Sequence, residues 1–250
     1  MRPYRVVARN IDPDADNAIH ADDVAQRHGF AGALVPGVEL FAYATAPLVE
    51  QWGAEFLTGG RIDLRFRRPV LDGEELLVRG VDPLTVTGPD GEVRCVGSAA
   101  LGPSAPLDLP VAPLPSAPLP EPVLGPMGTV SEPGTAGHAR EYLDAVCEPS
   151  SLYREQGFAH PGLLLRLVNL VLMRNVALGP WVHTASSCRL HAVARQPAQM
   201  QVRGLVTDLY ERGGHAYVRY DAVVLADEQP VMSVDHTAIY RLAPVRPVTV

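Results

Sequence analysis

The residues around position 20 hold side chains suited to acid–base chemistry. His20 follows a run rich in Asp and Asn, which contains Asp14, Asp16 and Asn17. An imidazole titrates near neutral pH, and a nearby carboxylate lets the two groups exchange protons with a bound substrate. A single histidine serves equally well as a structural residue in a core, so residue type alone leaves both roles open for His20.

Other kinds of chemistry find no support in the pattern. Four further histidines fall on strand-like runs without the tight pairs of a zinc site: His183, His191, His215 and His236. The three cysteines are an odd number and form no Cys-x-x-Cys pair, which indicates reduced thiols. The phosphate-binding glycine motifs, the Gly-x-Ser-x-Gly elbow and the His-Glu-x-x-His metal motif are missing. We therefore expect neither a metal nor a redox cofactor.

Two long apolar segments are the elements best placed to organise such a site. They span residues 38–53 and 163–179, and each follows a Pro-Gly pair. Both are apolar on most faces over three to four turns, which predicts two buried helices. Matched landmarks lie at nearly constant offsets: Gly37 and Gly162 are 125 residues apart, and the Arg-Gly pairs at 79–80 and 203–204 are 124 apart. This regularity predicts an internal duplication.

Strand-like runs follow each predicted helix and are separated by turn pairs. The turn pairs are Asp72-Gly73, Asp90-Gly91 and Gly213-Gly214. The pattern in each half therefore predicts one long helix followed by an antiparallel sheet, which is the hot-dog arrangement. Two fused copies would form an α+β double hot-dog, with their sheets joined edge to edge and both helices on one face. The alternative is a pair of unrelated α+β domains.

A proline-rich segment separates the two halves. Residues 103–126 carry proline at about every third position, which is incompatible with a helix or a central strand. We expect an extended, irregular and exposed spacer that rises ~3.1 Å per residue. The predicted organisation is an N-terminal repeat at 1–102, this linker at 103–126, and a C-terminal repeat at 127–250.

Composition excludes several classes of partner. The 250 residues carry a net charge of -7, which argues against nucleic acid and anionic membrane surfaces. No uninterrupted apolar run reaches the ~18–20 residues of a membrane helix, and the first residues lack the apolar core of a signal peptide. We therefore expect a soluble, cytoplasmic protein. All 21 basic residues are Arg, which is typical of a GC-rich, and so bacterial, genome.

The stretch 17–37 resembles the MaoC-like (R)-specific enoyl-CoA hydratase family. That family carries Asp-x-Asn-Pro-x-His, then an Ala-containing helix, a Gly-Phe pair and a Gly that opens the hot-dog helix. The matching positions are Asn17, Ile19, His20, Ala25, Gly29, Phe30 and Gly37. The run at 67–80 is similar to the family's strand and turn after that helix, and the second half matches as a degenerate copy. The resemblance implies a double hot-dog fold acting on an acyl thioester.

The resemblance also implies a role for each matching residue. His20 would be the acid–base group, and Asn17 would lie with the substrate-binding residues. Gly37 would bind the thioester carbonyl through its amide at a helix N-terminus, where developing enolate charge meets the helix dipole. The family's Asp lies five residues before the His, and that position is Ala15 here.

Three interpretations of the missing carboxylate remain open. A one-residue bulge could bring Asp16 inward, or Asp14 as the second choice. Glu39, two residues past Gly37, could face the pocket instead, although a first-turn acid also compensates the helix dipole. In the third interpretation the dyad is incomplete and the ordinary hydratase reaction is lost.

We therefore expect a hydratase or dehydratase for an enoyl or 3-hydroxyacyl thioester, carried by CoA or an acyl-carrier protein. The alternatives are a hot-dog thioesterase and a non-catalytic acyl-thioester-binding or partner subunit. Arg65, Arg67 and Arg68 could meet the carrier phosphate, although a solvated strand face explains them equally. We also expect only one working pocket, which lies in the first half. The protein should be a monomer or a homodimer.

Overall fold

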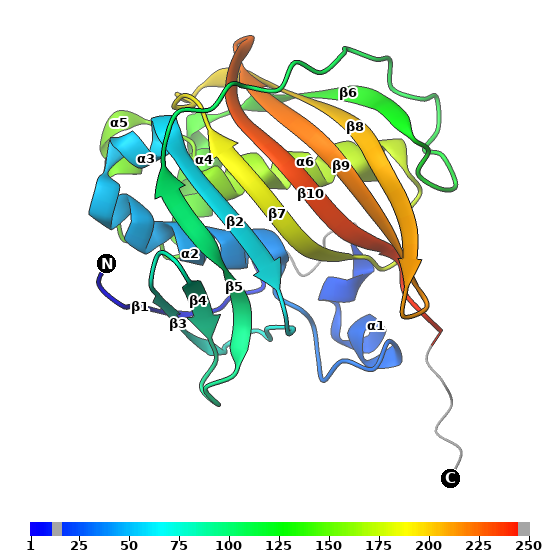
Figure 1. The fold of residues 1–250 in the computed structure, drawn as a ribbon, viewed down its shortest axis with the longest axis horizontal. Coiled ribbons are helices and arrows are strands. Elements are labelled where there is room, and N and C mark those ends of the chain that lie inside the picture. Colours follow the sequence, from blue (N-terminus) through cyan, green and yellow to red (C-terminus); the bar gives the residue numbers. More distant parts are fainter. Residues whose placement is uncertain (12–16, 245–250) are drawn as a thin grey trace.

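A computed structural model describes residues 1–11 and 17–244 of the chain (Figure 1). Within them, ten strands form one antiparallel sheet in the order β1-β3-β4-β5-β2-β7-β10-β9-β8-β6. The strands are β1 (Tyr4–Val7), β2 (Gly60–Phe66), β3 (Glu75–Arg79), β4 (Leu84–Thr87), β5 (Val93–Leu101), β6 (Gly125–Gly134), β7 (Val182–Leu190), β8 (Ala198–Arg212), β9 (His215–Ala226) and β10 (Gln229–Arg241). This is the predicted α+β double hot-dog.

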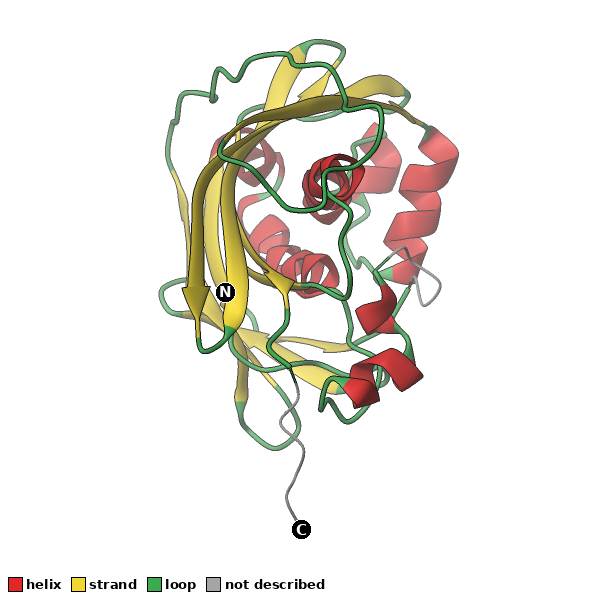
Figure 2. Cartoon of the chain, turned by 90° about the vertical axis from the view of Figure 1, so that its right-hand side faces the viewer, coloured by secondary structure: helices red, strands yellow, loops and turns green. Residues whose placement is uncertain are grey.

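Two central helices lie side by side in the curve of the sheet (Figure 2). They are α2 (Gly37–Trp52) and α6 (Pro161–Asn175), close to the predicted segments. Pro161 occupies the first turn of α6, where its missing N–H leaves no hydrogen bond unmade. The other helices are the 3₁₀ turn η1 (Ala18–His20), α1 (Asp22–Arg27), α3 (Ala54–Gly59), α4 (Ala136–Ala145) and α5 (Leu152–Gln156).

The two halves join through β2 and β7. These strands pair antiparallel from Arg61 opposite Arg189 to Arg65 opposite Ala185. On one side of the joint lie the strands of the first half, and on the other side those of the second half. The duplicated sheets are therefore joined edge to edge, as the repeat pattern predicts.

The proline-rich segment packs onto the outer face of the sheet before it reaches β6. Leu109 packs on Val223 and Leu225, apart from the main core. Further along, the amide of Leu119 donates to the carbonyl of Asn175 at 2.8 Å, at the C-terminal end of α6. Residues 103–124 contain no helix or strand, but Gly125 and Pro126 already belong to β6.

Several elements were not predicted from the sequence. Strand β6 contains two prolines and three glycines, which favour turns, and it is tolerated because it lies at the edge of the sheet. Strands β1 and β4 have only four residues each, too short for a clear alternation. The helices of the described residues include none long and apolar enough to cross a membrane.

Candidate functional site

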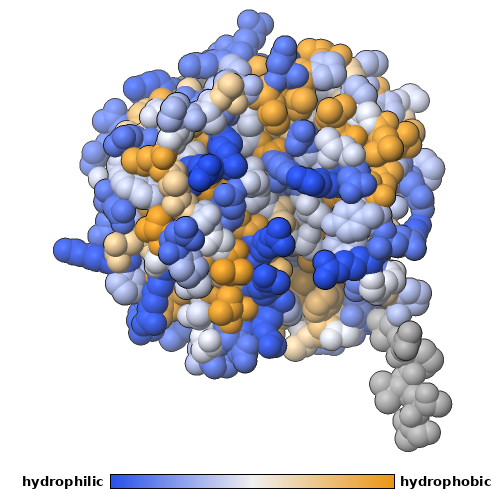
Figure 3. Space-filling view, viewed as in Figure 1, coloured by the Kyte–Doolittle hydropathy of each residue, from blue (hydrophilic) through white to orange (hydrophobic). Residues whose placement is uncertain are grey.

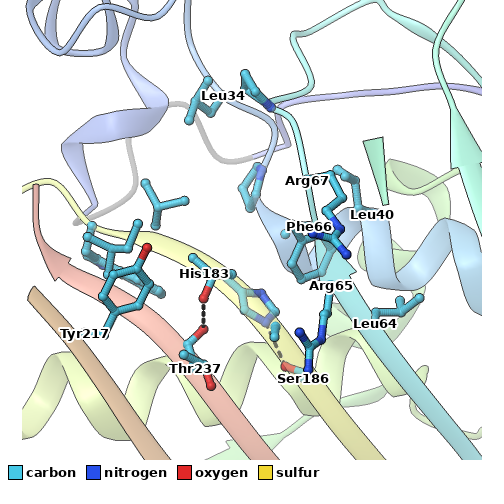
Figure 4. Close-up of a pocket in the computed structure, with 18 of the residues that line it drawn as sticks. Leu34, Leu40, Leu64, Arg65, Phe66, Arg67, His183, Ser186, Tyr217 and Thr237 are labelled. Carbon is cyan, nitrogen blue, oxygen red and sulfur yellow. Dashed lines mark hydrogen bonds between the residues drawn. The ribbon is translucent and has the colours of Figure 1, made fainter. Parts of the chain in front are cut away.

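A cavity of about 1310 Å³ lies at the N-terminus of α2, where β2 and β7 separate. Their pairing stops at Arg65 and Ala185, and just beyond it the rings of Phe66 and His183 meet edge to face, 4.5 Å apart between centroids (Figure 4). Apolar side chains line the inner part: Ile19, Leu34, Leu40, Leu64 and Val70. In the space-filling view, hydrophilic side chains flank a hollow near the end of β2 (Figure 3). An apolar chain could therefore enter from a polar rim.

His20 lies on the wall of this cavity with a defined tautomer. Its Nδ1 is 2.7 Å from the carbonyl oxygen of Leu34. A carbonyl only accepts hydrogen bonds, so Nδ1 carries the proton and Nε2 of the neutral ring keeps its lone pair. The side-chain amide of Asn17 lies 3.3 Å from that Nε2. The ring is thus oriented with Nδ1 toward the Leu34 carbonyl and Nε2 toward the Asn17 amide.

Asn17 links this histidine to the second half of the molecule. Its Oδ1 accepts from the backbone N–H of Trp181 at 3.2 Å, and its Nδ2 donates to the carbonyl of Trp181 at 2.9 Å. Asn17 also caps η1 by accepting from the amide of Ile19. Its amide is therefore engaged within the protein and contacts the His20 ring, while Asn17 also lines the cavity, and its predicted contact with substrate stays a prediction.

Gly37 opens α2 at the base of the cavity. Among the residues that the structure describes, the N–H groups of Gly37 and Val38 meet no acceptor. They point out of the helix end, at the positive pole of the dipole. A methyl group added to Gly37 would lie 2.6 Å from Nδ1 of His183, so only glycine fits this approach.

The predicted carboxylates fall in two different places. Asp14 and Asp16, like Ala15, lie outside the described residues. Glu39 is fully buried and pairs with Arg166 of α6 at 2.8 Å. It is absent from the cavity lining, so the structure does not place Glu39 facing the pocket, and its contact with substrate stays a prediction. The Glu39 side chain points toward α6 because Arg166 on that helix supplies the opposite charge.

Arginines stand at the mouth of the cavity. Arg65, Arg67 and Arg68 all line it and are exposed. Arg68 pairs with Glu92 at 3.0 Å, whereas Arg65 and Arg67 form no ion pair with any described residue. Two guanidinium groups therefore lie at the mouth without an ion-pair partner among the described residues, where they can meet an anionic ligand.

The corresponding place in the second half is closed. There the amide of Gly162 donates to Nδ1 of His160 at 2.9 Å, and Nε2 of His160 lies 3.1 Å from a Glu148 carboxylate oxygen. The rings of Tyr142 and Tyr153 pack against this imidazole. The Gly162 amide, the His160 ring and the Glu148 carboxylate therefore hydrogen-bond with one another, and none of these residues lines the large cavity. His160 is a helix cap here.

Much of the cavity wall comes from the second half, and three of its residues near the start of α2 were missed at the sequence level. Trp181 and His183 line it from the start of β7, and Asn169 lines it from α6. The Oδ1 atom of Asn169 is buried and has no donor among the described residues. A period-two pattern would have marked His183 as inward-facing, but an irregularity in the pairing of β7 with β10 shifts the alternation there.

The described residues place neither a metal-binding cluster nor a cysteine on the wall of the cavity. In residues 1–11 and 17–244 no group of three His, Cys, Asp or Glu side chains is arranged to hold a metal. Cys95 and Cys188 are buried, and burial raises the pKa of Cys95 to about 12, which keeps its thiol protonated. What the cavity does offer is the imidazole of His20, helix N–H groups that meet no acceptor among the described residues, and an apolar channel. These groups can polarise a carbonyl and move a proton beside it.

No protein-family model and no curated protein sequence matches the chain. Solved structures do match along nearly its whole length. A protein from Chloroflexus aurantiacus, described as a MaoC-domain dehydratase, is 12% identical with a TM-score of 0.65, covering 96% of this chain and 93% of its own. A conserved Mycobacterium tuberculosis protein with a double hot-dog fold is 13% identical with a TM-score of 0.64, covering 95% of each chain.

A third structure, described as a MaoC-like dehydratase, gives a TM-score of 0.57 at 14% identity and covers 96% of this chain and 97% of its own. At such low identities the similarity concerns the fold. It also bears on the resemblance found in residues 17–37, because the same architecture recurs in MaoC-like proteins. The chain has the double hot-dog fold of the MaoC-like dehydratases.

Proposed function

We propose that the protein adds water to, or removes it from, an enoyl or 3-hydroxyacyl thioester in the first-half cavity. One observation carries the proposal: His20 and Gly37 line the same cavity. The His20 ring is oriented so that Nε2 could act as a base, and the N–H groups at Gly37 meet no acceptor among the described residues. The fold supports the proposal because MaoC-like dehydratases share it.

The chemistry follows from these two groups. In dehydration, the thioester oxygen would accept from the Gly37 N–H as the C2–H bond breaks and enolate charge develops. The 3-hydroxyl then leaves as water with a proton from the second acid–base group. His20 would carry one of these transfers and a carboxylate the other, with Asp16 and then Asp14 as candidates. Hydration is the reverse, and neither direction needs a metal or redox cofactor.

The carrier would be CoA or an acyl-carrier protein. Arg65 and Arg67 stand at the cavity mouth without anionic partners among the described residues, where either carrier would place phosphate. The thioesterase alternative loses its candidate base, because Glu39 is buried against Arg166 instead of facing the cavity. No observation therefore favours hydrolysis over hydration.

Crotonyl-CoA hydration, followed by loss of the enoyl absorbance, tests the proposal. His20→Ala should lower kcat/KM by ~10²–10⁴-fold, the usual cost of losing a general acid–base group. His28→Ala is the matched control, because His28 ends α1 and is absent from the lining of the large cavity. His160→Ala should keep most of the activity while lowering thermal stability, since its ring caps α6. Release of free CoA without hydration would replace the proposal with hydrolysis.

The carboxylate is identified by a second set of variants. Asp16→Asn and Asp14→Asn should differ, with only one abolishing hydration. Ala15→Asp restores the residue of the MaoC-like pattern, and a gain in crotonyl-CoA hydration would indicate a site that had lost its usual acid. No gain, together with an unchanged need for His20, would mean that the pocket serves a different thioester reaction.

A further inference from the structure

The wall of the large cavity continues from the start of α2 onto the outer face of strands β10, β9 and β8. Alternate residues of these strands line it, which is the period-two pattern of side chains on one face of a sheet. On the β8–β9 hairpin they are Asp208, Tyr210, Arg212, His215, Tyr217 and Arg219. The proposed acid–base step uses none of these side chains, so this outer arm of the cavity needs its own explanation.

The cavity wall is positively charged, although the chain as a whole is acidic. Six arginines and three aspartates line it, whereas the whole chain carries a net charge of -7. Two of these aspartates already pair with two of the arginines, and the third, Asp208, lies opposite Arg219. Arg65 and Arg67 at one end and Arg212 at the other form no ion pair with any residue that the structure describes. This distribution favours a ligand that carries several negative charges.

Two tyrosines form a flat aromatic stack in the outer arm. Tyr210 and Tyr217 are opposite residues of β8 and β9, and their rings are 4.9 Å apart between centroids with an interplanar angle of 5° (Figure 4 labels Tyr217). The ring of His215 stands edge-on to Tyr217, and its Nδ1 accepts from the amide of Ala243 at 3.0 Å. A stacked pair keeps two outward ring faces, and Tyr210 is 38% exposed. Proteins bind nucleobases by stacking them on such rings.

A row of cross-strand neighbours connects the tyrosines to the end of α2. Tyr217 is opposite Ile239 of β10, and Ile239 is opposite Val182 of β7. All of them line the cavity, and Val182 begins β7, where the cavity reaches Gly37. Neighbouring strands lie ~4.8 Å apart, so the row from Val182 to Tyr210 spans ~14 Å. The pantetheine arm of CoA can cover a distance of this order between its thioester and its nucleotide.

We propose that Tyr210 and Tyr217 stack against the adenine ring of a nucleotide whose phosphates meet Arg212 and the arginines of the cavity mouth. This inference rests on the proposed function, because the row to Gly37 favours the nucleotide end of an acyl-CoA over a free nucleotide. A carrier protein holds its pantetheine arm by one phosphate and offers no base to the tyrosines. The β8–β9 hairpin of the second repeat thereby selects the carrier of a substrate that reacts in the first.

Calorimetry with adenosine 3′,5′-bisphosphate, the nucleotide end of CoA without its arm, tests the platform directly. Tyr217→Leu and the more exposed Tyr210→Leu should each weaken binding ~10-fold through lost base stacking, whereas Tyr217→Phe should keep it. Arg212→Gln should weaken binding and reduce its dependence on salt. Tyr240→Leu is the matched control, because Tyr240 is a partly exposed tyrosine of β10 that does not line the cavity. No binding by the wild type, or equal binding by both leucine variants, would overturn the proposal.

The source of the nucleotide is identified by competition. Displacement of bound butyryl-CoA by adenosine 3′,5′-bisphosphate would place the nucleotide of the carrier on the tyrosines. ADP that binds together with butyryl-CoA, and is lost in Tyr217→Leu, would assign the same platform to a free nucleotide.

Kinetics separate this proposal from the proposed function. Wild type should show a lower KM for crotonyl-CoA than for crotonyl-pantetheine. Tyr217→Leu should raise KM for crotonyl-CoA by ~10-fold and narrow this difference with little change in kcat, as expected for contacts made equally in the ground and transition states. Equal KM values in the wild type, or turnover of a crotonyl-carrier protein alone, would overturn the nucleotide site while the function stands. If no acyl thioester is turned over, the proposed function fails, and calorimetry still decides the nucleotide site.

Discussion

Gly37 and the ring of His183 share a space with no room for an added methyl group. A Cβ at position 37 would meet Nδ1 at 2.6 Å and Cγ at 3.1 Å, so the ring would have to move. The ring itself is held by Ser186 and by its stack on His236, so it cannot move cheaply. The same contact that excludes a side chain therefore packs the first residue of α2 directly against the imidazole.

Gly37→Ala should consequently lower kcat/KM for crotonyl-CoA by ~10²-fold and destabilise the protein by ~1–3 kcal/mol. Urea unfolding and steady-state rates measure both effects. Gly59→Ala is the control, because a Cβ at the end of α3 meets nothing within 4 Å and a helical Gly→Ala change is neutral or slightly stabilising. Full activity in Gly37→Ala would remove this amide from the site.

The buried histidine pair predicts a loss of stability in acid. In the unfolded chain a histidine takes up its proton near pH 6.5, whereas burial lowers the folded pKa of His236 to about 3. Below pH 6.5 the unfolded state therefore binds more protons, and stability falls by up to ~1.4 kcal/mol per pH unit for this residue. Urea unfolding near pH 7 and near pH 5 should show a smaller difference for His236→Asn than for wild type. An equal difference would mean that His236 titrates normally.

At the level of elements, the buried pair of Glu39 and Arg166 ties α2 to α6. Glu39→Gln leaves a partly buried guanidinium without this partner charge and should cost ~3 kcal/mol of stability. Hydration should stay close to wild type, because Glu39 does not line the cavity. Asp23→Asn, which breaks an exposed pair with Arg27, is the control and should cost less than ~0.5 kcal/mol. Loss of turnover without loss of stability would return Glu39 to the site.

The elements also show what the sequence could reveal. The two long helices, the turn pairs and the 124–125 offset reflect local periodicity, and these predicted the fold. Glu39 was misplaced because its direction depends on Arg166, 127 residues away. His183 was missed because its contact with Gly37 needs the pairing of β2 with β7 across the two repeats. Contacts between repeats leave no trace in the spacing of either one.

Over the whole molecule, the two repeats have taken different roles. In the first, the helix N-terminus is left open to a cavity of about 1310 Å³. In the second, His160 caps the equivalent amide of Gly162, and tyrosines fill the space around it. The second repeat instead contributes Trp181 and His183 to the wall of the cavity in the first repeat. The two repeats thus form one cavity between them. The first repeat supplies the open helix end, and the second supplies part of the wall.

This asymmetry predicts one acyl thioester per chain. Calorimetric titration with butyryl-CoA should give a stoichiometry near one for each 26.9 kDa chain, with light scattering supplying the mass of a monomer or homodimer. The second helix end cannot bind a carbonyl, because its amide already donates to His160. His20→Ala should bind with unchanged stoichiometry, since the acid–base group contributes to turnover more than to binding. Two equivalents per chain would show that the second repeat opens in solution, and the site would then have to be counted in both halves.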